Sequence, residues 1–429
     1  MSASVNGSVK DVIHRQLLQN LSAAEAWFHD VRRTVDIPFY SSYDIRDSGQ
    51  KVANIDANIY PAGFNNICPV DRENCGELVR TYVERHYGSN AKRILILTEE
   101  HTGNPYYWDN VATLQTIIAD AGLEVKLAFP NAHDQETFTM QSASRGPVQV
   151  NDVIVRDGQI SVKGFVPDLV VSNNDFSLFY DEWGPSLRTP INPPRELGWY
   201  QRKKSSYFKH YNQLCDEFAR VIAMDPWLLK VDTQLFENFD ISDEGSRDAL
   251  ANKVDTMIDR LKIEYAKRGI QDEPFVFIKN NSGTYGLGVI RVQNGLEVKE
   301  LNNRTRKKMK AAKGGREIEE VIIQEGVRSI VRTEGVTAEP TLYLLGCQLA
   351  GGFLRSHAEK DETESLNSPG AVYRRLCVSD LKVSTEGHPM ENVYGWVARL
   401  GVLAIGRESA EMSVKYVGYD RWTKGNCNG

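Results

Sequence analysis

The sequence lacks the cysteine patterns that mark disulfide frameworks and zinc modules. Its six cysteines are scattered over 429 residues, and none of them forms a C-x-x-C pair or joins histidines at metal-ligand spacing. In a chain of this length the pattern favours free thiols and a reducing compartment. Residues 1–11 also lack the apolar run of a secretory signal, and no hydrophobic run is long enough to span a membrane. We therefore expect a cytoplasmic protein without a membrane partner.

The sequence also has little excess charge of either sign. Its formal net charge is −6 at pH 7, and a mildly acidic chain of this kind is not typical of nucleic-acid-binding proteins. The nearest approach to a basic patch, residues 304–313, is interpreted as the solvated face of a helix. The chain is too long for one ordinary domain, so we expect two or three packed subdomains. These features leave open whether the protein forms a homo-oligomer.

A glycine-rich turn between two apolar runs is the most informative stretch of the sequence. The runs Phe275–Ile278 and Val289–Val292 are predicted strands, and Lys279 ends the first of them. The turn that joins the strands is built from small residues, among them Ser282, Gly283, Gly286 and Gly288. Glycines let backbone N–H groups approach a ligand closely, and successive N–H groups can cradle an anion. Because a lysine adds a point charge suited to phosphate, the stretch indicates a phosphate-binding hairpin.

The turn differs from two other glycine loops that bind phosphate. A P-loop ends in Gly-Lys-Ser/Thr, whereas Gly288 is followed by Val289. A dinucleotide fingerprint has the order G-x-G-x-x-G and opens a helix, whereas this turn has the order G-x-x-G-x-G and leads into a strand. On these residues alone, a tight β-hairpin without a ligand remains an alternative.

Several further segments follow the hairpin in a recognisable order. A basic helical stretch, residues 303–313, precedes the apolar run Val321–Val327, which contains Gln324 and Glu325. Residues 339–355 then form two predicted strands around Gly346 and end on Arg355. An acidic and amide-bearing segment, residues 364–370, comes next.

This order resembles the ATP-grasp superfamily over residues 200–410. The whole chain is similar to the proteobacterial glutamate–cysteine ligases with an ATP-grasp fold, and two phrases carry this closer match: NIDANIYPAGFNNIC, residues 54–68, and ILILTEEHTGNPYYWDN, residues 94–110. The resemblance implies an α/β (α+β) protein, with an ATP-grasp fold and an N-terminal parallel-sheet domain. It also implies an ATP-dependent ligase that forms γ-glutamylcysteine from L-glutamate and L-cysteine through an acyl phosphate. That reaction is the first step of glutathione biosynthesis, with ATP and Mg²⁺ as cofactors.

Two other functions stay open. Nothing in the residues themselves identifies cysteine as the amine, so another carboxylate–amine ligase, similar to glutathione synthetase, is one alternative. An ATP-grasp protein that binds nucleotide without catalysis is the other. The intact lysine, glycine turn and strand-end arginine argue against the second.

The chain is expected to divide at the proline-rich stretch 190–200 into a substrate-binding domain, residues 1–195, and an ATP-grasp domain, residues 196–429. The second domain is expected to contain a nucleotide-binding hairpin, a hinge strand and a catalytic part, at residues 274–292, 321–327 and 337–412.

In the first domain, strands that alternate with a helix predict a parallel sheet. The predicted strands are residues 93–97, 123–128 and 168–172, and the predicted helix is residues 110–121. A helix is predicted over residues 8–34, a polar loop held by the scaffold over 38–67, and a helix followed by a strand over 389–405.

The resemblance assigns nucleotide binding to the second half of the chain. Lys279 and Lys204 are expected to hold phosphates, with Arg202 and Lys203 as rivals of Lys204. Arg355 and Lys279 are the expected catalytic residues, because cations stabilise a transferred phosphoryl group. The hinge strand is expected to bond adenine through its backbone. The implied nucleotide-binding residues are Lys204, Lys279, Ser282, Gly283, Gly286, Gly288, Gln324, Glu325 and Val327.

Magnesium takes oxygen ligands, and three side chains are candidates for holding it. Glu364 and Asn367 are spaced i, i+3 and can converge in a turn. Glu408 follows the predicted last strand and matches a metal-binding acid of ATP-grasp ligases. The E-x-N pair that usually follows that strand is missing here, and Glu339 is the alternative ligand.

Glutamate as a substrate needs a cation for its α-carboxylate and acceptors for its ammonium group. The polar segment supplies both kinds of group, in Arg46, Lys51, Asp56, Asn58 and Asn65. Ligands of parallel sheets bind beyond the carboxyl ends of the strands. Further substrate-binding candidates follow two predicted strands at that edge: Glu100, His101 and Asn174.

Overall fold

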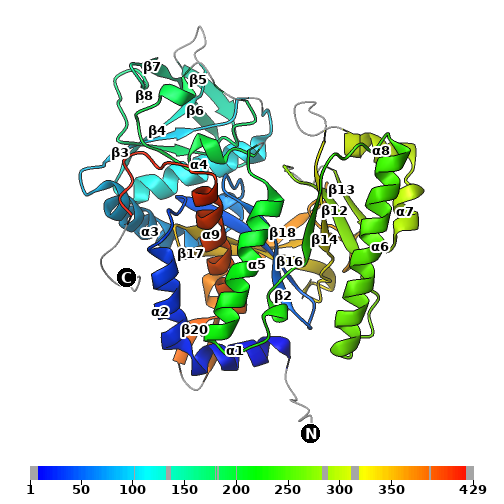
Figure 1. Cartoon of the computed structure of the whole chain (residues 1–429). Coiled ribbons are helices and arrows are strands. Elements are labelled where there is room, and N and C mark those ends of the chain that lie inside the picture. Colours follow the sequence, from blue (N-terminus) through cyan, green and yellow to red (C-terminus); the bar gives the residue numbers. More distant parts are fainter. Residues whose placement is uncertain are drawn as a thin grey trace.

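The computed structural model describes residues 8–100, 102–131, 137–178, 180, 183–199, 201–282, 288–310, 318–385 and 388–421. Within these residues the chain has the expected mixed α/β architecture, with three larger sheets that we call the central, N-terminal and hairpin sheets (Figure 1). Two short ladders accompany them, β7 (Ile154–Arg156) with β8 (Gln159–Ser161) and β19 (Lys382–Thr385) with β20 (His388–Glu391). No helix of the described part is both long and apolar enough to cross a membrane.

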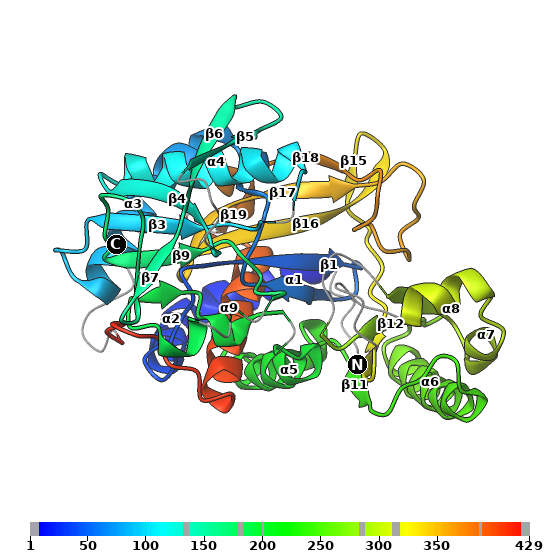
Figure 2. The ribbon, with the colours of Figure 1, turned by 90° about the horizontal axis from the view of Figure 1, so that it is seen from above.

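The central sheet combines segments from both ends of the chain. Its antiparallel strands lie in the order β18, β17, β16, β1, β2, with β15 paired to β16. Their bounds are β1 (Tyr40–Asp47), β2 (Val52–Asn58), β15 (Arg332–Thr333), β16 (Val336–Leu345), β17 (Gln348–Ser356) and β18 (Val372–Leu376). Figure 2 shows β1 and β16 side by side. Strands from opposite sides of the expected domain boundary at residue 195 therefore share one sheet.

The polar segment 38–67, expected as a loop, instead provides the strands β1 and β2. Every residue of β1 is buried, including its charged ones. Asp44 and Arg46 are tolerated there because they pair with Arg355 of β17 and Glu339 of β16, respectively. Residues 42–46 and 54–58 do alternate polar and apolar side chains, which is the period of a strand. The polar composition of the segment outweighed this signal in the prediction of a loop.

Helices cover one face of the central sheet (Figure 1). Helix α9 (Val393–Glu411) contacts β1, β2 and β16, and α5 (Lys204–Val221) packs against α9. The helix and strand expected over residues 389–405 occur in the opposite order, β20 and then α9, because the apolar run continues as a helix that is buried on nearly all sides. The helix expected over residues 8–34 is two helices, α1 (Val9–Gln19) and α2 (Leu21–Arg32), which meet at Asn20.

The N-terminal sheet confirms the predicted parallel arrangement. Strands β10, β9, β3, β4 and β6 are parallel in that order, and β5 adds an antiparallel edge. Their bounds are β3 (Arg93–Leu97), β4 (Glu124–Phe129), β5 (Thr137–Gln141), β6 (Pro147–Asp152), β9 (Leu169–Ser172) and β10 (Ile191–Asn192). Helices α3 (Pro69–Tyr87) and α4 (Pro105–Asp120) share one apolar cluster with this sheet and with β16 and β17. This cluster joins the N-terminal sheet to the central sheet.

The hairpin sheet contains the two strands predicted on either side of the glycine turn and the strand predicted as a hinge; their binding roles stay predictions. Its antiparallel order is β11, β14, β12, β13, with β11 (Thr233–Phe236), β12 (Val276–Asn280), β13 (Val289–Val292) and β14 (Val321–Glu325). An apolar cluster ties it to α6 (Glu244–Lys267) and α7 (Gly295–Lys299), and α8 (Asn303–Lys310) follows. Gly283 and Gly286 of the turn lie outside the described residues.

The close approach of α9 to β1 depends on Gly401. A Cβ at this position would overlap the ring of Tyr43 and lie 2.9 Å from the hydroxyl of Tyr207. We expect Gly401→Ala to destabilise the protein by about 1–3 kcal/mol through overpacking, although alanine is the better helix former by about 1 kcal/mol. Urea unfolding measures the change. Gly103→Ala is the control, because a Cβ there meets nothing within 4 Å. Equal urea midpoints of unfolding for the two variants would contradict the packing argument.

Candidate active site

A cavity of about 520 Å³ lies where the three sheets meet. Its wall includes Glu99 and Asp175 from the N-terminal sheet side, Asn281 from the end of β12, and Tyr373 of β18. Several residues that the sequence analysis singled out also line it: Asp56, Asn58, Asn65, Lys204, Ser282, Arg355 and Asn367. Expected nucleotide-binding, substrate-binding and metal-binding residues therefore share one space.

Arg355 contributes a buried cation to this wall. Its Nη1 lies 2.8 Å from Asp44 Oδ2 and 2.9 Å from Glu339 Oε1, and Arg46 pairs with the other oxygen of Glu339. Burial raises the pKa of Asp44. Burial has the same tendency at Glu339, but the two arginines outweigh it and lower the pKa of that carboxyl. The Nε atom of Arg355 is buried and has no hydrogen-bond partner among the described residues, so the side chain keeps a donor for a ligand.

Lys204 and Lys279 both act on the charge of Asp56. Lys204 Nζ forms an ion pair with Asp56, and the backbone of Lys204 is tied to the end of β12 by a hydrogen bond to the carbonyl of Asn281 at 2.8 Å. Burial would raise the pKa of Asp56, but both lysines lower it below its usual value. Lys279 does not line the cavity; its Nζ donates to the carbonyl of Ile55 at 3.1 Å and to Gln324 Oε1 at 2.6 Å. Burial lowers the pKa of Lys279 to about 8.

The expected metal ligands are not gathered in one place. Glu408 lies on α9, where Arg202 holds it through Nε at 2.9 Å and Nη2 at 2.8 Å. The carboxylate of Glu364 accepts from Lys360 at 2.8 Å and does not line the cavity. Of the three candidates only Asn367 lines it. Glu339, the alternative, is engaged by two arginines. Among the described residues these carboxylates do not form a group close enough to share one ion, and the magnesium ligands stay a prediction.

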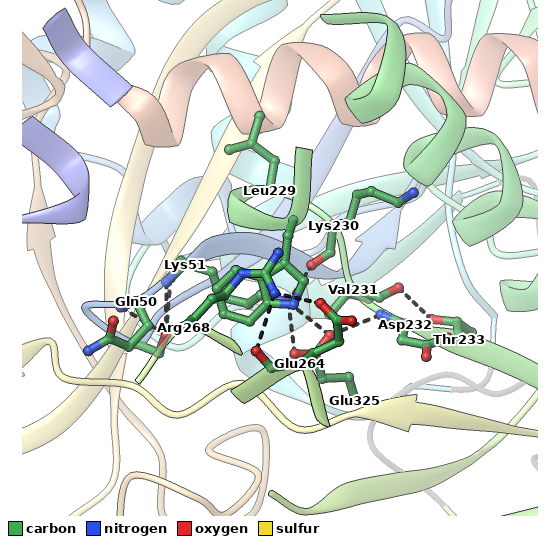
Figure 3. Close-up of polar contacts among 12 residues, drawn as sticks. Gln50, Lys51, Leu229, Lys230, Val231, Asp232, Thr233, Glu264, Arg268 and Glu325 are labelled. Carbon is green, nitrogen blue, oxygen red and sulfur yellow. Dashed lines mark hydrogen bonds and ion pairs between the residues drawn. The ribbon is translucent and has the colours of Figure 1, made fainter. Parts of the chain in front are cut away.

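Lys51 and Arg46, two of the expected substrate-binding residues, form ion pairs with protein carboxylates and do not line the cavity. Figure 3 shows Lys51 bonded to Glu325, with Nζ–O distances of 2.7 and 2.9 Å, and to the carbonyl of Lys230 at 3.0 Å. Lys51 also lies over the ring of Trp227 at 4.0 Å. Arg46 pairs with Glu339 and donates to backbone carbonyls. Neither residue lines the cavity, and the carboxylate of Glu325 is likewise occupied.

The remaining candidate residues also include some that do not line the cavity. Asn174 is buried and donates to the carbonyl of Thr98 at 2.9 Å, and Glu100 accepts from Asn131. Neither lines the cavity, whereas Glu99, next to Glu100, does. Val327 is buried at the end of the hinge segment. His101 lies outside the described residues.

Four further charged residues line the cavity: Glu99, Asp175, Arg202 and Lys203. Sequence reasoning placed Glu99 and Asp175 in the polar clusters that follow two strands but did not select them as site residues, and it named Arg202 and Lys203 only as rivals of Lys204. Glu99 and Asp175 follow the strands β3 and β9, at the sheet edge where ligands are expected. That position was a signal for both residues. It could not distinguish Glu99 from Glu100, because the orientation of a residue just beyond a strand is not fixed by the strand's period.

Two of three comparisons with known proteins found matches. The model of the glutamate-cysteine ligase family matches residues 14–409. A structure from Methylobacillus flagellatus, provisionally described as a gamma-glutamylcysteine synthetase, is 30% identical and superposes with a TM-score of 0.85, covering 96% of this chain and 98% of that one. A glutathione synthetase-like effector from Globodera pallida is 10% identical with a TM-score of 0.40, over 86% of this chain and 85% of that one. A comparison with curated proteins gave no match.

The pair Arg202–Glu408 provides a test of the electrostatics around the cavity. The Glu408 side chain is fully buried and that of Arg202 is 13% exposed. We expect Glu408→Gln to destabilise the protein by about 3–5 kcal/mol, because it leaves a buried guanidinium without its counter-charge. The matched control is Glu411→Gln on the same helix. The Glu411 side chain is 42% exposed, and its loss should cost about 1 kcal/mol or less. Similar unfolding midpoints for both variants would show that the buried pair has no special role.

Proposed function

The chain belongs to the glutamate–cysteine ligase family, and we propose that it joins the γ-carboxylate of L-glutamate to the amino group of L-cysteine with consumption of ATP. The product is γ-glutamylcysteine, from which glutathione is made. The observation that carries the proposal is the shared cavity, because it combines cations suited to phosphates with carboxylates suited to an ammonium group. Its volume of about 520 Å³ is within the range of small-molecule sites.

The proposed reaction has two steps. An oxygen of the glutamate γ-carboxylate attacks the γ-phosphorus of ATP, so that a P–O bond to ADP breaks and an acyl phosphate forms. The cysteine amine then attacks the acyl carbon, loses a proton, and inorganic phosphate leaves. Positioning and charge neutralisation supply most of the catalysis in such phosphoryl transfer.

The residues of this chain have separate roles in the proposal. Arg355 offers its unpartnered Nε to the transferred phosphoryl group. Lys204, at the cavity wall, neutralises phosphate charge, and Asp56 holds it in place. Lys279 is bonded to Gln324 in this structure, and in the proposal it exchanges that bond for one to phosphate when nucleotide binds. Glu99 and Asp175, at the opposite wall, are suited to an amino-acid ammonium group.

The proposal also includes magnesium as a cofactor and the cytoplasm as the location of the protein. Nucleotide phosphates bring oxygen ligands to magnesium, which keeps several waters, and Asn367 is the candidate side chain that lines the cavity. We propose a cytoplasmic location because the cysteine substrate and the enzyme's own thiols need a reducing environment. A homo-oligomer is compatible with the proposal and is not needed for it.

The family's reaction can be tested against its nearest alternative with a panel of substrates. We expect ADP release to require L-glutamate and L-cysteine together, with γ-glutamylcysteine as the product identified by mass spectrometry. A ligase similar to glutathione synthetase would instead need γ-glutamylcysteine and glycine. ATP binding without stimulation by any acid–amine pair would identify a non-catalytic nucleotide-binding protein and would refute the proposal.

Lys279 gives the proposal a pH dependence. Its pKa of about 8 means that the ammonium form decreases above pH 8, and a phosphate nearby favours that form and raises the pKa. ATP binding should therefore take up protons near pH 8 and weaken as the pH rises to 9. Lys279→Met should weaken binding at pH 7 by roughly ten- to a hundred-fold, since a charge-assisted hydrogen bond contributes about 1.5–3 kcal/mol.

Calorimetry in buffers of different ionisation enthalpy measures both the affinity and the proton uptake. Lys209→Met is the control, because the side chain of Lys209 is 53% exposed and pairs with Glu411. This variant should retain the affinity and the pH dependence of the wild type. Unchanged affinity and proton uptake in Lys279→Met would remove this lysine from the nucleotide site.

A further inference from the structure

Two thiols from distant parts of the chain touch beside the cavity. Cys68 and Cys377 are 309 residues apart in the sequence, and their Sγ atoms lie 2.8 Å apart. Both are buried, with exposed fractions of 1% and 5%. Cys68 immediately precedes α3, and Cys377 immediately follows β18. The chemistry proposed for the cavity uses neither of them.

The geometry favours a disulfide over a metal site. Two sulfurs on one tetrahedral zinc, each about 2.3 Å from the ion, lie roughly 3.8 Å apart, which is well above 2.8 Å. Among the described residues, Asp71 is the one further metal-type ligand in the group, and its Oδ2 already accepts the backbone N–H of Val378 at 2.9 Å. A disulfide of about 2.05 Å needs the two sulfurs to approach by roughly 0.8 Å.

The surroundings prepare the two thiols for different roles. Cys68 is the N-cap residue of the long helix α3, and the thiol of Cys377 donates to its sulfur. Burial would raise the pKa of Cys68, but the Cys377 thiol and the backbone N–H groups of α3 lower it below its usual value. Burial and the hydrogen bond to Cys68 raise the pKa of Cys377 and keep its thiol protonated, and Arg375 Nε, 2.7 Å from Cys377 Sγ, offsets part of this effect. Cys68 is therefore suited to react first and Cys377 to resolve the product.

We propose that Cys68 and Cys377 are an oxidation site that forms an intramolecular disulfide with hydrogen peroxide as the oxidant. The Cys68 thiolate attacks peroxide, so that an S–O bond forms, the O–O bond breaks, and water leaves after proton uptake. The Cys377 thiol then loses its proton and attacks the Cys68 sulfur, the S–S bond forms, and the oxygen leaves as a second water. Two thiols are oxidised and one peroxide is reduced. This inference does not depend on the proposed ligase activity.

The disulfide would join two segments of the chain that each contribute residues to the cavity lining. Asn65 and Asn66, just before Cys68, line the cavity, and so does Tyr373, four residues before Cys377. The bond would also close a loop that spans most of the chain, which restricts the unfolded state. Oxidised protein should therefore have a higher Tm than reduced protein.

Peptide mapping of the full chain tests the inference. The protein is reduced, freed of reductant, treated with hydrogen peroxide, alkylated, and digested without reduction. We expect one linked pair of peptides containing Cys68 and Cys377, which disappears after treatment with dithiothreitol. Cys68→Ser and Cys377→Ser should each abolish both the link and the rise in Tm. The control Cys347→Ser should retain both, because Cys347 is a partly exposed cysteine outside this pair.

Three results would overturn the inference. Both thiols could stay open to alkylation after peroxide treatment of folded wild-type protein, or the main link could use Cys427 or a second chain. The purified protein could instead contain zinc that either serine variant loses, which would identify a metal site. Because the wild-type map needs no variant, a serine variant that fails to fold does not remove the test.

Discussion

A chain of buried ion pairs holds the central sheet together. Asp44, Arg355, Glu339 and Arg46 alternate in charge across β1, β16 and β17. Each charge is stable in the interior only while its partners are present, because an uncompensated buried charge is costly. The network therefore fixes the register of three strands. It also positions the Arg355 guanidinium at the cavity wall, so the stability of the sheet and the electrostatics of the site rest on the same side chains.

Local sequence patterns predicted those strands whose apolar residues follow one another directly in the sequence. The short apolar runs of β3, β4 and β9 predicted a parallel sheet, and the structure confirms it. The hairpin β12–β13 was predicted because a glycine turn separates two apolar runs. The strands β1 and β2 escaped prediction although residues 42–46 and 54–58 alternate polar and apolar side chains, because the segment is unusually polar for buried strands. The charges of β1 are compensated by Glu339 and Arg355, about three hundred residues away, and no local pattern indicates such partners.

The candidate site shows the same division. Lys204, Asp56 and Arg355 do converge on one cavity, whereas Lys51 and Arg46, from the same polar segment as Asp56, are occupied by Glu325 and Glu339. Composition indicates that a segment carries charges suited to a substrate, but not which of them already have a partner. Glu408 illustrates the point further, since its partner Arg202 is separated from it by about two hundred residues of chain. The roles of these residues in binding remain predictions.

The position of β1 between β2 and β16 has a consequence for how the protein is made. Strand β1 leaves the ribosome early, yet its neighbour β16 begins only at Val336. Most of the chain must therefore be synthesised before this edge of β1 can pair, and its polar backbone groups stay unpaired until then. Pairing between such distant segments is slow because a long loop must close first. The nascent N-terminal part is thus an incomplete folding unit whose open strand edge would be a natural target for chaperones.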